Sequence, residues 1–161
     1  MARHTDRSDP NLLEAVIAND HLVLGGLLTE LSRGPDTPGV MENLVSTMHH
    51  RERVHMAVVE RVLLPVLAES DERSLVEQTV TGHEVVRRHL DELAHSDRLH
   101  RSEVVHQLED DLADQFAFET GVLIPAIEHT PVADPGNLGF QLSALTAAGL
   151  SSTTFGSSYG G

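Results

Sequence analysis

The sequence predicts an all-α protein, an up-down-up-down four-helix bundle followed by a tail rich in glycine and serine. Three observations support this prediction. Apolar residues recur at helical spacing through most of the chain. Segments rich in Gly and Pro, or in polar residues, interrupt this pattern at 33–39, 68–74 and 95–101. Four amphipathic helices of about 20–30 residues, joined by short polar loops, are typical of such a bundle.

Each helix is expected to carry one apolar seam that includes polar residues at one point. The first helix should begin near Asp9 and Pro10, because aspartate caps helices and proline fits the first turn. The third should begin at Ser74, since Ser74 and Glu77 have the spacing of a capping box. In chain order the four seams are Leu13, Ile17, His21, Leu24, Leu28 and Leu31; Leu44, Met48, His55, Val59, Val62 and Val66; Val76, Val80, His83, Val86, Leu90 and Leu93; and Val105, Leu108, Leu112, Gln115, Glu119 and Val122.

A length of 161 residues suits one domain. We divide the chain into an N-terminal arm (1–9), the helical bundle (10–131) and a tail (132–161) in which no residue after Asp134 is charged. The composition of the tail favours a flexible segment. An apolar strap on the bundle and a docking peptide for a partner are the alternatives.

Composition excludes several classes of function. A net charge of −14 argues against binding to nucleic acid or to an anionic membrane surface. The absence of cysteine excludes disulfides, thiolate zinc sites and cysteine nucleophiles. The start of the chain lacks the apolar segment of a secretory signal, and no run approaches transmembrane length, so we expect a cytoplasmic protein. The oligomeric state stays open.

Two pairs of similar stretches relate the two halves of the chain. HMAVVERVLLPVL (55–67) recurs as QFAFETGVLIPAI (115–127), and residues 21–31 resemble residues 83–93. The halves therefore read as two related helical hairpins, which would place the polar seam residues at similar depth. The chain has eleven histidines but one tyrosine and no tryptophan. This excess of histidine favours a metal site, because histidine is the commonest metal ligand.

The polar seam residues are His21, His55, His83, Gln115 and Glu119. A buried polar group without a partner costs about 1–3 kcal/mol. A single metal ion would satisfy several of these groups together, and a closed hydrogen-bond network among them is the alternative.

Residues 10–130 resemble the hemerythrin-like family of cation-binding (HHE) domains. The resemblance rests on Asp20-His21, on His55 ten residues before Pro65, on Gly82-His83, and on Glu119 six residues before Pro125. It implies a four-helix bundle around a non-haem di-iron centre. In that family two helices supply one histidine each, and two supply a His-x-x-x-Glu pair whose glutamates bridge the irons.

By position, the metal ligands carried over are His21, His55, His83 and Glu119. Two positions depart from the family pattern: Val59 replaces the first bridging glutamate, and Gln115 replaces the last histidine. Glu60 does not simply substitute for Val59, because one extra residue rotates it by about 100° around the helix.

This reduced set favours one ion over two. His21, His55 and Glu119 make the two-histidine, one-carboxylate set expected of mononuclear non-haem iron, and zinc would also accept these donors. His83 would be a fourth ligand or an acid–base group, and Gln115 a weak ligand or a hydrogen-bond donor, so these two are the candidate catalytic residues. The resemblance implies chemistry with dioxygen, peroxide or nitric oxide, with a small organic substrate in the case of a non-haem iron oxidoreductase.

Three alternatives stay open. The first is a metal-free bundle that serves as a small-molecule-binding or protein-interaction module. The second is a functional di-iron protein with non-standard ligands. The third is a ferritin-like di-metal protein, because the Glu-x-x-His pattern occurs at Glu52/His55, Glu92/His95 and Glu103/His106.

Overall fold

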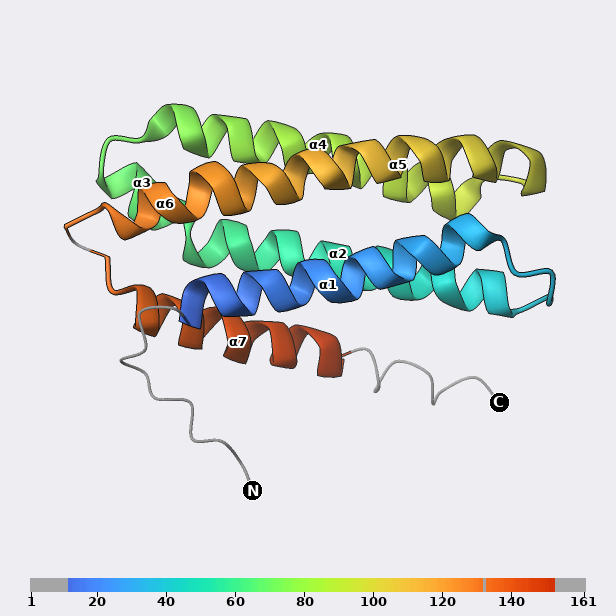
Figure 1. Cartoon of the computed structure of the whole chain (residues 1–161), viewed down its shortest axis with the longest axis horizontal. Helices are drawn as coiled ribbons and strands as arrows, with labels where there is room; N and C mark the ends of the chain where they lie inside the picture. Colours follow the sequence, from blue (N-terminus) through green and yellow to red (C-terminus); the bar gives the residue numbers. More distant parts are fainter. Residues whose placement is uncertain (1–11, 132, 153–161) are drawn as a thin grey trace, which may run out of the picture.

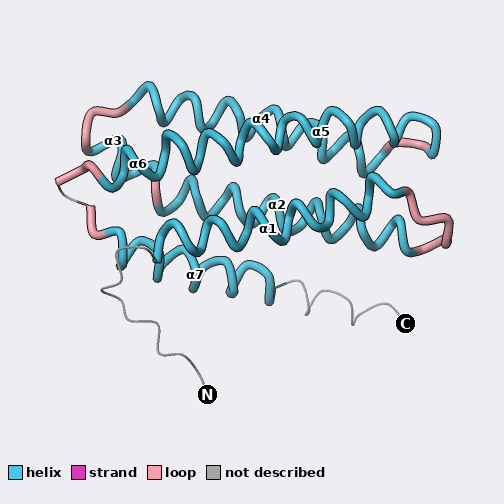
Figure 2. The backbone as a smooth tube through the Cα atoms, in the orientation of Figure 1, coloured by secondary structure: helices cyan, strands magenta, loops and turns pink. Residues whose placement is uncertain are grey.

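The computed structural model describes residues 12–131 and 133–152, and within these ranges it is helical and contains no strand. The elements are α1 (Leu12–Arg33), α2 (Val40–Val62), α3 (Leu64–Glu69), α4 (Arg73–His95), α5 (Arg98–Phe118), a π-helical turn η1 (Glu119–Leu123), α6 (Ile124–Glu128) and α7 (Pro135–Ser151). The helices α1, α2, α4, α5 and α7 pack together (Figure 1). Of the first four, each packs against the next along the chain, and α5 returns to α1. Figure 2 shows the loops at the two ends of the long helices. The predicted arm, 1–9, lies outside the described residues.

Residues 135–151 form a helix, so the prediction of a flexible tail is wrong for this segment. Asp134 caps α7 through its side chain, and proline occupies the first turn. The helix lies along α1 and α2 (Figure 1), as the apolar-strap alternative would have it. Small residues allow this close packing: a Cβ added to Gly139 would lie 2.6 Å from the backbone nitrogen of Leu13. The rest of the predicted tail, 153–161, lies outside the described residues.

The repeated Val-Leu-x-Pro runs interrupt both helices that contain them. Proline lacks an N–H and clashes with the carbonyl four residues earlier, so an α-helix cannot continue unchanged through it. Accordingly, α2 ends at Val62 and α3 begins with Pro65 in its first turn. In the second copy, the backbone N–H of Ile124 donates to the carbonyl of Glu119, five residues back, and this π turn accommodates Pro125.

The π turn also moves the buried face of this helix by one residue. The sequence pattern placed Val122 on the apolar seam, but its side chain is 41% exposed, whereas Leu123 is fully buried. A π turn takes one more residue than an α turn, so the residue that faces the core shifts by one position. The prediction for Val122 was therefore wrong.

The capping box predicted at Ser74 is also absent. Glu72 precedes α4 and makes no side-chain cap, while Ser74 lies inside the helix, where its hydroxyl accepts a hydrogen bond from Gln78. The chain turns sharply at Asp71, whose φ of 64° lies in the left-handed region. This turn brings the chain into helical conformation at Arg73, before Ser74 could serve as the cap.

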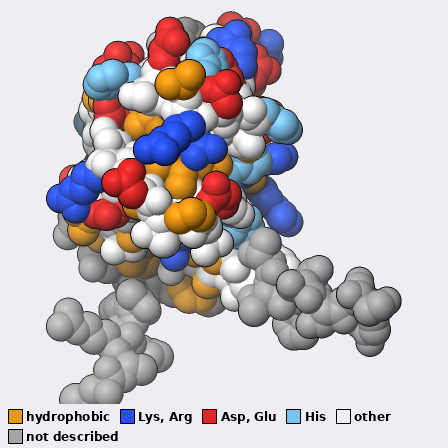
Figure 3. Space-filling view, turned by 90° about the vertical axis from the view of Figure 1, so that its right-hand side faces the viewer, with side chains coloured by type: hydrophobic (Ala, Val, Ile, Leu, Met, Phe, Trp, Pro, Cys, Tyr) orange, Lys and Arg blue, Asp and Glu red, His pale blue; other side chains and the backbone are white. Residues whose placement is uncertain are grey.

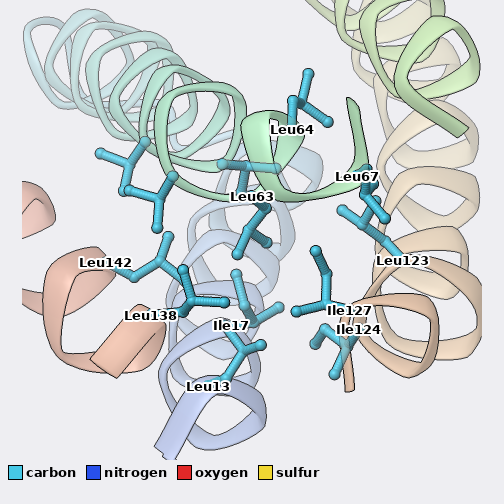
Figure 4. Packing of buried hydrophobic residues seen from close by; sticks show 13 residues of the cluster. Leu13, Ile17, Leu63, Leu64, Leu67, Leu123, Ile124, Ile127, Leu138 and Leu142 are labelled. Carbon is cyan, nitrogen blue, oxygen red and sulfur yellow. The ribbon is translucent and has the colours of Figure 1, made fainter. Parts of the chain in front are cut away.

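Two apolar clusters fill the interior of the bundle. The first, shown in Figure 4, includes Leu13, Ile17, Val59, Leu63, Leu67, Leu123, Ile127, Leu138 and Leu142. The second includes Leu24, Leu28, Met48, Leu90, Leu93, Leu108 and Leu112. Along α1 the sequence passes from the first cluster to the second around His21, and along α5 and η1 it passes back around Gln115 and Glu119. A layer of polar side chains therefore separates the two clusters.

Among the described helices, α1 alone is long and apolar enough to cross a membrane, judged by length and composition. The expectation that no run approaches this length therefore does not hold for α1. Core helices of soluble proteins pass the same test, and α1 packs against α2, α5 and α7. At the end of the bundle seen in Figure 3, acidic, basic and histidine side chains are interspersed.

Candidate metal centre

The carboxylate of Glu119 lies at the centre of the polar layer. Its side chain is 1% exposed. Its Oε2 atom lies 2.7 Å from Nε2 of His21 and 3.0 Å from Nε2 of His55. Its Oε1 atom lies 3.4 Å from Nε2 of His83. Three histidines, one each from α1, α2 and α4, thus converge on a carboxylate at the start of η1. The structure brings together all four residues that the sequence indicated as metal ligands.

Three of these four residues form a compact group that could hold a metal ion. His21, His55 and Glu119 each offer one ligand atom, and these atoms lie within 4.8 Å of one another. Two imidazoles and one carboxylate are the donors of mononuclear non-haem iron sites and also suit zinc. His83 lies outside this group and approaches the second oxygen of Glu119.

Carboxylates on the outer side hold two of the histidine rings in position. The Nδ1 atom of His55 lies 3.2 Å from Oδ2 of Asp20, and that of His83 lies 2.8 Å from Oε1 of Glu60. Metal-binding histidines commonly donate their second ring N–H to such a carboxylate, which sets the tautomer. Donation from Nδ1 leaves Nε2 with a lone pair that points at Glu119.

A lone pair cannot face a carboxylate oxygen at 3.0 Å unless a positive charge compensates. One source is a second proton on the ring. Burial lowers the pKa of His55, but the charge of Glu119 and hydrogen bonds to Asp20 and Glu119 outweigh it, so this pKa lies well above its usual value. Burial conversely raises the pKa of Glu119, yet the charge of His55 and the three histidine hydrogen bonds hold it well below the usual value. A divalent cation would supply the same compensation in place of the protons. The residues present therefore fit a metal ion.

Glu60 reaches this site from the outside. Besides His83, it accepts a hydrogen bond from Nη2 of Arg87 at 2.6 Å, and the hydrogen bond from His83 is the main cause of its lowered pKa. Val59, the preceding residue, is fully buried in the first apolar cluster. Val59 therefore offers the polar layer no donor atom.

Glu52 and Gln115 form a second buried polar pair, which the sequence did not predict. Gln115 lies one turn before Glu119 but turns towards α2, where its Nε2 donates to Oε1 of Glu52 at 2.8 Å. The Oε2 atom of Glu52 and the Oε1 atom of Gln115 are buried and have no hydrogen-bond partner among the described residues. Burial raises the pKa of Glu52 to about 7. The only signal in the sequence was the Glu-x-x-His pattern that Glu52 makes with His55.

The remaining Glu-x-x-His patterns do not contribute to the layer. The side chains of Glu92 and Glu103 are 40% and 68% exposed and pair with His100. Within the described part of the chain, Glu52/His55 is therefore the only such pair at the site. This arrangement does not give the four-glutamate pattern of a ferritin-like di-metal protein.

Phe116 fixes the ring of His21, the third histidine of the layer. The two rings are stacked with centroids 4.0 Å apart and planes inclined by 15°. Sequence reasoning assigned no role to Phe116, because its contact with His21 joins α5 to α1 and leaves no local pattern.

Comparison of the chain with known protein families, with curated proteins and with solved structures finds no match in any of the three.

Proposed function

We propose that this protein is a hemerythrin-like up-down-up-down bundle, extended by α7, that holds one metal ion on His21, His55 and Glu119. We further propose that the ion is iron and that the protein acts on or senses dioxygen, peroxide or nitric oxide. The observation that carries the proposal is the convergence of two histidine Nε2 atoms on one buried carboxylate oxygen, at 2.7 and 3.0 Å. Zinc would fit the same donors.

When bound, iron on such a set supplies redox chemistry together with open coordination positions. The protein supplies the orientation of the ligands and a route for protons. Asp20 fixes the ring of His55 through Nδ1, and Glu60 fixes that of His83. Because Glu60 holds Nδ1 of His83, the Nε2 atom can take up or release a proton beside the centre.

A second ion is not part of this proposal. Two ferric ions would need further anionic ligands, and Val59 offers none. Glu60 is already paired with His83 and Arg87 on the outer side. Reversible dioxygen carriage by two irons is therefore disfavoured. We also propose a cytoplasmic location and no nucleic-acid or membrane partner, in keeping with the net charge of −14.

The metal content of the full-length protein, expressed with iron supplied, tests this proposal. We expect one ion per chain by elemental analysis. Two ions would overturn the mononuclear site, and none would overturn the metal site altogether. His106→Ala is the control, because His106 is exposed and its ring nitrogen pairs with Glu109 on the surface. This variant should keep the metal of the wild type.

In the second candidate function, protons on the histidines compensate the charge of Glu119 in place of a metal ion. One observation favours it. All three histidine Nε2 atoms lie within hydrogen-bonding distance of Glu119, so protons can bridge them. The protein would then be a metal-free bundle that binds a small molecule or a protein partner. In that case a chelator would leave the melting temperature unchanged, whereas a metal protein would lose the stabilisation that binding confers.

A further inference from the structure

A cavity of about 590 Å³ lies between α4 and α5 and reaches the candidate metal centre. Its inner lining includes His83, Gln115 and Glu119, all buried, whereas His21 and His55 do not line it. Exposed residues of both helices, such as Gly82 and Asp114, form the outer part of the lining. The cavity therefore connects solvent to the side of the polar layer that carries His83, and not to the side that carries His21 and His55.

This cavity is larger than a diatomic ligand requires. Pockets for small organic molecules commonly measure about 300–1,000 Å³, while one water molecule takes up about 30 Å³ of liquid. Dioxygen or nitric oxide alone would leave most of the space to solvent. Apolar side chains, among them Val85 and Phe118, contribute to the walls alongside the polar ones.

The charge of the outer lining disfavours the entry of anions. Glu77, Asp111 and Asp114 lie in the outer part, and no arginine is among the described residues that line the cavity. Asp111 is paired with His89, which leaves Glu77 and Asp114 as the carboxylates that act most directly on an approaching ligand. A cleft lined by one sign of charge repels ions of that sign and concentrates the opposite one.

Gln115 adds a requirement for a hydrogen-bond donor. Gln115 is among the residues that line the cavity and is 7% exposed. Its Nε2 is committed to Glu52, and its Oε1 is buried behind the cavity surface without a partner. A rotation of the Gln115 side chain that brings Oε1 to the cavity would let a ligand donate an O–H or N–H to this unsatisfied oxygen.

We propose that this cavity binds a small neutral or cationic organic molecule with a terminal O–H or N–H group and holds it beside the metal centre. The inference rests on the proposed function for what the molecule meets there, namely the open side of the centre and His83. The expected ligand is therefore neither an anion nor a molecule without a hydrogen-bond donor.

Four probes of similar size differ in charge and in their hydrogen-bond donors: n-propanol, n-propylamine, propionate and methyl ethyl ether. Binding would be followed by chemical-shift changes in NMR spectra of the full-length protein, both zinc-loaded and chelator-treated. We expect n-propanol and n-propylamine to shift the Gln115 side-chain amide and the Gly82 backbone amide, and both other probes to bind at least about tenfold more weakly. Equal binding of propionate or of the ether would overturn the inference.

The Gly82→Leu variant tests whether the probes bind in this cavity. A Cβ at Gly82 meets no atom within 4 Å, so the new side chain can extend into the cavity without disturbing the packing of α4. Gly26→Leu is the matched control, since Gly26 is also an exposed helical glycine with open space around it but lies on α1, outside the cavity. Both variants should fold, because glycine inside a helix is unfavourable. Gly82→Leu should weaken n-propanol binding at least about tenfold while Gly26→Leu leaves it unchanged.

Equal affinity in the two variants would show that the probes bind elsewhere and would overturn the inference. Asp114→Asn should lower the affinity for n-propylamine relative to n-propanol, because it removes an acidic group from the outer lining. An unchanged ratio would refute the role of charge. The two samples keep the two proposals apart. Binding of n-propanol to the chelator-treated protein would support the cavity independently of the metal, while a zinc-loaded sample that retains no zinc would refute the metal site and leave the cavity in place.

Discussion

Replacing Glu52 with glutamine should stabilise the metal-free protein at neutral and alkaline pH. Burial raises the pKa of Glu52 from 4.5 to about 7 in the folded protein. Below pH 4.5 the carboxyl group is neutral in both the folded and the unfolded chain. Between 4.5 and about 7 it ionises only in the unfolded chain, so the folded protein holds more protons and its stability falls as the pH rises.

The expected magnitude follows from the same two pKa values. The gap between 4.5 and about 7, at about 1.4 kcal/mol for each pH unit, amounts to about 3 kcal/mol. Above pH 7 the wild type carries this full cost of a buried charge, and Glu52→Gln does not. The carbonyl of the new glutamine can still accept the hydrogen bond from Gln115, so we expect the variant to keep the local geometry.

Urea unfolding in the presence of a chelator, followed by far-ultraviolet circular dichroism, would measure this effect at about pH 5 and about pH 8. The two proteins should have similar stability at the lower pH, and the variant should be more stable at the higher pH by up to about 3 kcal/mol. The exposed Glu84 provides the control, because Glu84→Gln removes the same charge from the surface of α4. If wild type and Glu52→Gln lose stability in parallel between the two pH values, Glu52 does not carry the buried charge and the reasoning fails.

Three further predictions concern the ligands and the packing of α7. His55→Ala should abolish metal binding while the helical content stays close to that of the wild type; normal metal content by elemental analysis would contradict the ligand assignment. Asp20→Asn should weaken zinc binding about 10–100-fold in calorimetric titrations, because it removes the carboxylate that holds Nδ1 of His55; unchanged affinity would mean that the 3.2 Å contact does not orient the ring. Gly139→Ala should lower the free energy of unfolding by about 1–3 kcal/mol, since its Cβ would lie 2.6 Å from the backbone nitrogen of Leu13. Gly26→Ala is its control and should instead stabilise α1 by about 0.5–1 kcal/mol, because its Cβ meets open space; equal melting temperatures for the two variants would contradict the close packing of α7.

Much of the layout follows from local sequence. Residues at helical spacing that were placed on the seam, such as Ile17, Leu28 and Leu90, are buried as predicted. The repeat aligned His55 with Gln115, one turn before Glu119, and Nε2 of His55 lies 3.0 Å from Oε2 of Glu119. Such inferences succeed because periodicity and spacing are properties of a single helix, and the seams of packed helices must face one another.

Other features arise only when helices meet. The segment 135–151 has a composition typical of a linker, and it forms a helix where its small residues let it lie against α1 and α2. Because of the π turn before Pro125, Leu123 and not Val122 faces the core, and a uniform helical period does not predict this shift. In α7, tertiary packing overrides weak intrinsic propensity, because the burial gained by the whole assembly exceeds the local preference.

The sequence by itself determined which residue types reach the middle of the bundle: three histidines and one glutamate on four helical seams. The tertiary structure decided how they are connected. It placed Glu60 behind His83, Asp20 behind His55, and paired Gln115 with a buried Glu52. These partners come from different helices, and the direction in which a side chain points across a helix interface depends on the rotation and axial offset of both helices. A one-dimensional pattern constrains each helix separately, so it cannot specify which of two neighbouring polar groups will become a metal ligand and which its support.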